Sequence, residues 1–172
     1  ISVTGVQTCA LPISDHFDVS VLQACGPISN ATSVCAAGSS SCTFTYSGQP
    51  FLATITARNA ANGITTNYNG TATTTPALAQ LVSLSAATNG TLGSFTASSV
   101  AATKFVGGVA SGVSGTFTFT NKLTAPAAVQ VRATDAVNAI TSAGGSEGSV
   151  VLRSGRLRLT NAFGSEKRNI TV

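Results

Sequence analysis

Apolar and polar residues alternate with a period of two in several short runs of the chain. The clearest run is 51–58, in which Phe51, Ala53, Ile55 and Ala57 fall on one face. This alternation is typical of a β-strand with one buried face. Similar runs predict further strands at 16–21, 43–46, 64–68, 79–84, 115–120 and 129–133.

Turn-forming residues separate these runs at intervals of about ten residues. Asn-Gly dipeptides occur at 62–63, 69–70 and 89–90, and they tolerate the positive φ angles of tight turns. No stretch has the 3.6-residue period of an amphipathic helix. We therefore expect an all-β fold, in which residues 43–137 supply the roughly seven strands of an immunoglobulin-like β-sandwich.

The segments around the predicted sandwich differ in composition. Residues 15–42 contain a short strand and a loop with cysteines, and 138–149 are rich in Gly, Ser and Ala, as linkers are. Residues 150–172 begin another β pattern, which has too few strands to close a core of its own. We interpret this last segment as the truncated start of a second β domain.

The first residues have an unusual pattern. Residues 3–13 resemble the translation of a common sequencing adapter over eleven consecutive positions. We therefore interpret residues 1–14 as an adapter-derived artefact and exclude them from the fold prediction; an apolar leader or a first strand is the alternative. Because the chain starts at Ile1 and contains no Met, we expect it to be a fragment of a longer protein.

The composition limits the chemistry that the chain can perform. Only 8% of its residues are charged, and it has one histidine, His16. A glycosidase needs two carboxyl groups facing each other across the scissile bond, and no such pair is indicated by the widely spaced acids. We expect no enzymatic activity and no cofactor. The acids are Asp15, Asp18, Asp135, Glu147 and Glu166.

Metal binding is weakly indicated. Asp135 lies at the end of a predicted strand, as do the acidic residues of calcium-binding cadherin-like sandwiches, but calcium prefers six or more oxygens, usually from several carboxylates. No acid lies close to Asp135 in the sequence, so we expect it to cap a turn. The cysteine spacings lack the CxxC form of zinc sites, and His16 stands alone.

Three cysteines remain when residues 1–14 are excluded: Cys25, Cys35 and Cys42. A disulfide that closes this loop would restrict the unfolded chain by about 3 kcal/mol and would form in an oxidising compartment. We prefer the pair Cys25–Cys42, which would join the two ends of the loop to the first core strand. Cys35–Cys42 is the alternative.

The net charge of +4 is unevenly distributed. Five of the nine basic residues lie in the last twenty positions: Arg153, Arg156, Arg158, Lys167 and Arg168. Several alternate with leucines, which indicates the solvated face of a strand pair. Aromatic residues for base stacking are not interspersed among them, so we expect no nucleic-acid partner. No run of eighteen apolar residues predicts a membrane span.

Two separated groups of motifs resemble one protein family. The first group consists of FTYSGQPF at 44–51, TARNA at 56–60 and TTNYNG at 65–70, and the second is GRLRLTNAFGSE at 155–166. These motifs resemble the large uncharacterised domain of MshQ-type proteins, which are linked to biogenesis of the mannose-sensitive haemagglutinin (MSHA) pilus, a bacterial type IV pilus. The triplet at 15–17 also fits this family, and the resemblance covers most of 15–166.

The resemblance implies an exported protein of Gram-negative bacteria, located at the cell surface, secreted or in the periplasm. The domain has no established activity in that family. We therefore expect a non-catalytic structural or docking module, whose partners are other domains of the same large protein and pilus or cell-surface components. The main alternative is an adhesin module that binds a glycan or a host surface through its Thr-rich faces. A calcium-dependent sandwich is a more distant one.

The chain departs from the family pattern in two places. The insertion that contains Cys35 lengthens the loop before residue 44. After Glu166, residues 167–172 do not continue with the Leu/Pro-rich strand of the family. We interpret these six residues as the product of a frameshift or another sequencing fault.

Overall fold

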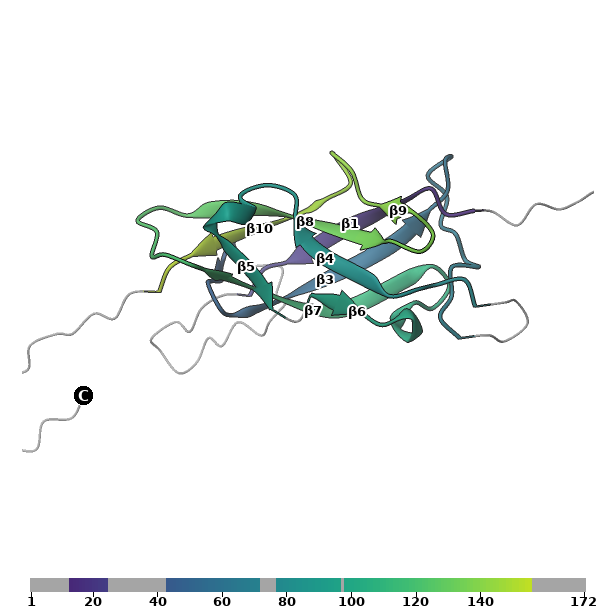
Figure 1. The fold of residues 1–172 in the computed structure, drawn as a ribbon, viewed down its shortest axis with the longest axis horizontal. Helices are drawn as coiled ribbons and strands as arrows, with labels where there is room; N and C mark the ends of the chain where they lie inside the picture. The colour runs from purple at the N-terminus through teal and green to yellow at the C-terminus, as the bar shows by residue number, and fades with distance from the viewer. Residues whose placement is uncertain (1–12, 25–42, 72–76, 97, 156–172) are drawn as a thin grey trace, which may run out of the picture.

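The structure, a computed structural model, describes residues 13–24, 43–71, 77–96 and 98–155, and this part is mainly β-structure (Figure 1). Two short 3-10 helices, η1 (Gly90–Leu92) and η2 (Ala102–Lys104), interrupt the strands. The all-β prediction is confirmed. The strands are β1 (His16–Leu22), β2 (Thr45–Tyr46), β3 (Pro50–Arg58), β4 (Val82–Ala86), β5 (Gly93–Thr96), β6 (Ser99–Val100), β7 (Val109–Phe119), β8 (Ala127–Asp135), β9 (Ile140–Thr141) and β10 (Gly148–Arg153).

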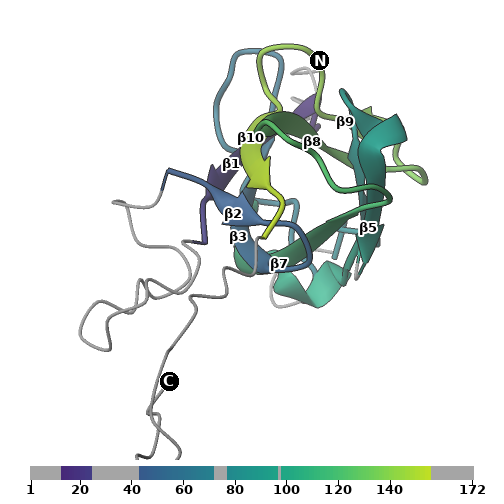
Figure 2. The same ribbon diagram turned by 90° about the vertical axis from the view of Figure 1, so that its left-hand side faces the viewer.

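All of these strands belong to one mixed sheet. Its main order is β2-β10-β8-β9-β1-β3-β7-β5, and β4 pairs with β8 and with β6. Viewed from one end, the sheet curls around the interior (Figure 2). The short strand β9 pairs with both β8 and β1 and so joins strands that a sandwich would keep in two separate sheets. The immunoglobulin-like sandwich is therefore not confirmed.

The core contains the apolar face predicted for the third strand. Phe51, Ala53, Ile55 and Ala57 are each at most 2% exposed, whereas the intervening side chains of β3 are partly exposed. Antiparallel pairing with β1 and β7 on its two edges places β3 inside the sheet. The alternation of Thr with apolar residues therefore predicts correctly which face of the strand is buried.

The strand predicted at 16–21 is present and lies inside the same sheet. Strand β1 runs antiparallel to β3 from the pair His16↔Arg58 to the pair Leu22↔Leu52. Phe17 is fully buried and its ring packs at 5.5 Å from the Tyr68 ring, edge to face. Strand β1 is thus part of the core.

Strand β10 requires a correction to the predicted domain organisation. We expected a linker at 138–149 and a second β unit from 150, but Gly148–Arg153 pairs with β8 and, in parallel, with β2. A Cβ on Gly148 would lie 2.7 Å from Cγ2 of Val21, so this glycine permits β10 to pass close to β1. Sequence composition alone makes the same glycine look like part of a linker. Residues 156–172 lie outside the described part.

The strand predicted at 64–68 is wrong. Ile64 makes one isolated bridge to Arg58, and the chain then turns, with the Tyr68 N–H donating to the Thr65 carbonyl at 2.9 Å. Gly70 follows at a close approach, where a Cβ would lie 1.7 Å from the Ala102 carbonyl oxygen. The segment is a loop that packs across one end of the sheet.

Candidate functional site

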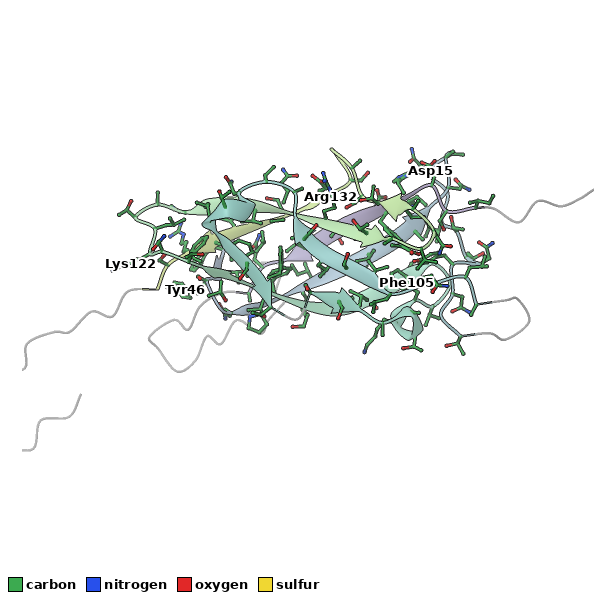
Figure 3. The ribbon with its side chains drawn as sticks, viewed as in Figure 1. Asp15, Tyr46, Phe105, Lys122 and Arg132 are labelled. Atoms are coloured by element: carbon green, nitrogen blue, oxygen red, sulfur yellow. The ribbon has the colours of Figure 1, made fainter. Side chains whose placement is uncertain are left out.

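A buried polar network lies at one end of the sheet, where the loop at 64–70 meets the turn between β8 and β9. Figure 3 labels Asp15 and Phe105 at this end, with Tyr46 and Lys122 at the opposite end. The network is centred on Asp135, the last residue of β8, which is fully buried. Because a buried carboxylate requires hydrogen-bond donors, its partners define the local structure.

The Asp135 carboxylate accepts four hydrogen bonds. Its Oδ2 accepts from the Tyr68 hydroxyl and from the Asn138 side-chain amide, both at 2.7 Å. Its Oδ1 accepts from the backbone N–H groups of Val137 and Asn138, both at 3.0 Å. Asp135 therefore caps the β8–β9 turn, as the sequence predicts, and it also ties the distant Tyr68 loop to that turn.

Among the described residues, the fold places no set of metal ligands around Asp135. Across 13–24, 43–71, 77–96 and 98–155, no three His, Cys, Asp or Glu side chains gather as metal ligands do. The four hydrogen bonds to Asp135 instead fix the geometry of two loops. In those same ranges, no helix is long and apolar enough to cross a membrane.

The ring of Tyr68 packs among aromatic side chains. It is 2% exposed and meets the ring of Phe105 edge to face at 4.9 Å. Burial raises the pKa of the Tyr68 phenol far above its ordinary value, and the hydrogen bond to Asp135 raises this pKa further, against a smaller opposing effect of the Gln80 N–H. Tyr68 therefore stays protonated as a donor to Asp135.

This raised pKa predicts a loss of stability at alkaline pH. Above about pH 10 the unfolded chain releases the Tyr68 proton while the folded chain keeps it. The free energy of unfolding should then fall by up to about 1.4 kcal/mol per pH unit. Urea unfolding from about pH 8 to about pH 11 measures the slope. Tyr68→Phe should abolish this contribution, with Tyr46→Phe as the matched control; a decline unchanged in Tyr68→Phe would contradict the assignment.

A cavity of about 250 Å³ adjoins the network. Three of its wall residues, Ser14, Thr65 and Asn67, are at least nine-tenths buried. The Ser14 and Thr65 hydroxyl oxygens and both polar atoms of the Asn67 amide are buried without a hydrogen-bond partner among the described residues. Buried polar atoms are nearly always paired, so this cavity is the candidate site. Its lining is Ile13, Ser14, Thr65, Asn67, Tyr68, Leu78, Asn138 and Ile140.

Sequence reasoning missed this cavity. Thr65 and Asn67 lie in a run that resembled a strand, and Ser14 fell inside the excluded leader. These residues come together only when the loop at 64–70 folds near residues 13–14 and 138–140, which are distant in the sequence. No spacing or motif in the sequence carries that information.

Three of the acids singled out from the sequence, Asp15, Asp18 and Glu147, lie beside basic groups. Oδ2 of Asp15 lies 3.0 Å from Nδ1 of His16, within hydrogen-bond distance, and Asp18 forms an ion pair with Arg58 at 2.7 Å. His16 Nε2 is also 3.7 Å from Asp18. Elsewhere, Arg132 and Glu147 form a 2.6 Å ion pair. Glu166, Cys25, Cys35 and Cys42 lie outside the described residues, so the disulfide stays a prediction.

The basic residues near the end of the chain are described only in part. Arg153 is exposed on β10, next to the fully buried Leu152, as the alternating pattern predicts. Its guanidinium lies 4.7 Å from the centre of the Phe44 ring, a distance within the range of a cation–π contact. Arg156, Arg158, Lys167 and Arg168 lie beyond the described residues.

Comparison with known families matches most of the chain. A family model described as DUF6701, third domain, matches residues 15–148. The matched range begins just before β1 and ends at the first residue of β10. Neither the curated proteins nor the solved structures contain a match to the chain.

Proposed function

Since the chain belongs to the DUF6701 third-domain family, we propose that it is a non-catalytic structural or docking module of a larger exported bacterial protein. One observation supports this role most directly. Each carboxylate in the described ranges is engaged in a contact that holds the fold together or neutralises a neighbour: Asp15, Asp18, Asp135 and Glu147.

Two of these contacts are ion pairs that link different parts of the sheet. The Asp18–Arg58 pair links neighbouring strands β1 and β3, and the Arg132–Glu147 pair links β8 to the residue before β10. The Glu147 side chain is only 5% exposed. These carboxylates hold neighbouring parts of the sheet together, whereas a glycosidase would need two carboxyl groups directed at a shared substrate position.

The proposed setting is biogenesis of an MSHA-type type IV pilus outside the cytoplasm. The motifs at 44–51 and 155–166, which resemble MshQ-type proteins, support this setting. The family description as a third domain supports a multidomain protein. The proposed partners are the other domains of that protein and pilus or cell-surface components.

An in-frame deletion of codons 15–153 in the source bacterium tests this function. We expect a several-fold decrease in surface pili, counted by electron microscopy, with recovery when the intact gene is restored. The control variant is Thr54→Val, on the partly exposed face of β3 and away from the candidate site, which should leave pilus numbers unchanged. Normal pili in a deletion strain that still exports the shortened protein would overturn the proposal. Normal pili combined with lost attachment would favour the adhesin alternative instead.

A further inference from the structure

We propose that one end of the domain is a docking face for the domain that precedes it in the same protein. This entry face is the end at which the chain enters β1, where Figure 3 labels Asp15 and Phe105. The inference rests on the proposed function, in which the chain is one module of a larger protein, and it names the surface that takes part. The face consists of exposed apolar residues on four connecting segments: Ile64, Leu78, Leu81, Val106 and Val137.

Large apolar side chains are exposed mainly at this end. Outside residues 1–14, six such residues occur in the described part of the chain, and five of them belong to the entry face. The sixth, Leu22, is the last residue of β1 and lies at the far end of that strand. Single exposed apolar residues are common on protein surfaces, whereas a cluster of them marks an interaction site.

Hydrogen bonds join the four segments to one another. The Asn138 side-chain amide donates to the Leu78 carbonyl at 3.1 Å, which joins the β8–β9 turn to the residues before β4. The Ala79 N–H donates to the Asn69 carbonyl at 3.2 Å, and the N–H that follows Asn69 donates to the Phe105 carbonyl at 3.0 Å. The exposed apolar side chains therefore lie on one connected surface.

The segments of the entry face carry almost no charge. Lys104 is their only Lys, Arg, His, Asp or Glu, although together they span 59–71, 77–81, 101–108 and 136–139. A solvated protein surface normally contains many charged residues, whereas the centre of a protein interface is depleted of them. The composition of these segments thus matches a surface that a partner covers.

The direction of the chain identifies the partner. Strand β1 begins at His16, and just before it the Asp15 N–H donates to the Arg58 carbonyl at 2.6 Å. The part of the protein that precedes residue 15 is therefore attached at this end. Attachment raises the local concentration of a partner, so that even a modest contact is occupied. The family description as a third domain implies that other domains come earlier in the protein.

The part of the protein that follows is attached at the other end. Strand β10 ends at Arg153, and the Ser154 hydroxyl then accepts from the Leu123 N–H at 2.9 Å. Ser154 and Lys122 line one shallow depression, at the end of the domain where Figure 3 labels Lys122 and Tyr46. This exit lies opposite the entry face, so the preceding domain is the partner that the chain itself holds beside the apolar residues.

The test compares hydrogen exchange, measured by mass spectrometry, in the complete exported protein of the source bacterium and in the 172-residue chain. Peptides that cover 64–70, 77–81 and 136–139 should exchange about tenfold more slowly in the complete protein. Leu81→Lys and Val137→Lys should each remove this protection, because a buried, unpaired charge opposes association.

Two controls separate docking from folding. In the 172-residue chain, Leu81→Lys and Val137→Lys should keep the melting temperature within about 2 °C, since these residues are already 63% and 74% exposed. In the complete protein, the matched variant Leu22→Lys places the same charge on an exposed leucine at the far end of β1. It should leave the protection of the entry face intact.

Three results would overturn the docking face. The first is equal exchange of these peptides in the complete protein and in the 172-residue chain. The second is protection that persists in both lysine variants of the face. The third is protection that appears in the 172-residue chain alone as its concentration rises, which would assign the face to a second copy. Pilus loss on deletion of codons 15–153, together with any of these results, would leave the module role standing and overturn the docking face alone.

Discussion

Replacing Asp135 with alanine should lower the free energy of unfolding by about 3 kcal/mol. The substitution removes the acceptor of four hydrogen bonds. The Tyr68 hydroxyl then lies in the interior without its partner, since this residue is 2% exposed, and the backbone N–H groups of 137 and 138 lose their cap. Urea unfolding at neutral pH measures the change.

Two milder variants show which part of the effect belongs to the Tyr68 contact. Asp135→Asn keeps Oδ1 for the two backbone donors, and the Tyr68 hydroxyl can turn to accept from the new amide. The Asn138 side-chain amide loses its acceptor, so the loss should be about 1–2 kcal/mol. Tyr68→Phe removes one hydrogen bond and should cost about 1–2 kcal/mol. A loss below about 1 kcal/mol in Asp135→Ala would show that the network contributes little to stability.

A chain that ends after Glu147 should fail to fold stably. This truncation removes β10, and with it the fully buried Val150 and Leu152. Their burial is worth about 2 kcal/mol each, and the edges of β8 and β2 lose the strand that pairs with them. Since a whole domain is stable by about 5–15 kcal/mol, the loss is a large part of the total. Circular dichroism and thermal unfolding of the purified chain measure it.

The matched control is a chain that ends after Gly155, which retains β10 complete. It should show the β-rich spectrum and the cooperative transition of the full chain. If the chain ending at Glu147 melted like this control, β10 would be dispensable, and the segment from 148 onward would belong to another unit after all.

The sequence predicts best those strands in which polar and apolar side chains alternate without interruption. In β3, Thr54 and Thr56 separate the buried Ala53, Ile55 and Ala57, and strand, face and burial were all predicted correctly. The two-residue strand β9 is too short to produce any period, yet its pairing turns a predicted sandwich into one continuous sheet. A pairing of that kind depends on where distant strands lie, so neither the composition nor the alternation pattern predicts it.

Glycine and long-range contacts account for the remaining differences. Gly148 resembles a linker residue in the sequence, but its lack of a side chain is what lets β10 approach Val21. Asp135 was predicted as a turn cap from its neighbours, whereas its partner Tyr68 lies 67 residues earlier in the chain. The polar atoms beside the cavity could not be predicted for the same reason. The residues that line the cavity come from the first described residues, the loop at 64–70 and the β8–β9 turn, which are distant in the sequence.

The central claim is that the described strands, from β1 to β10, belong to a single cooperative β domain built around one core. Native-state hydrogen exchange tests it directly by comparing amides in β1, β8 and β10, among them that of Val19, which donates to the Ser146 carbonyl at 2.7 Å. The account predicts that the slowest amides of all three strands exchange only through global unfolding, with one shared free energy. Amides of β10 that exchanged through a separate opening, several kcal/mol below that of β8, would contradict a single domain.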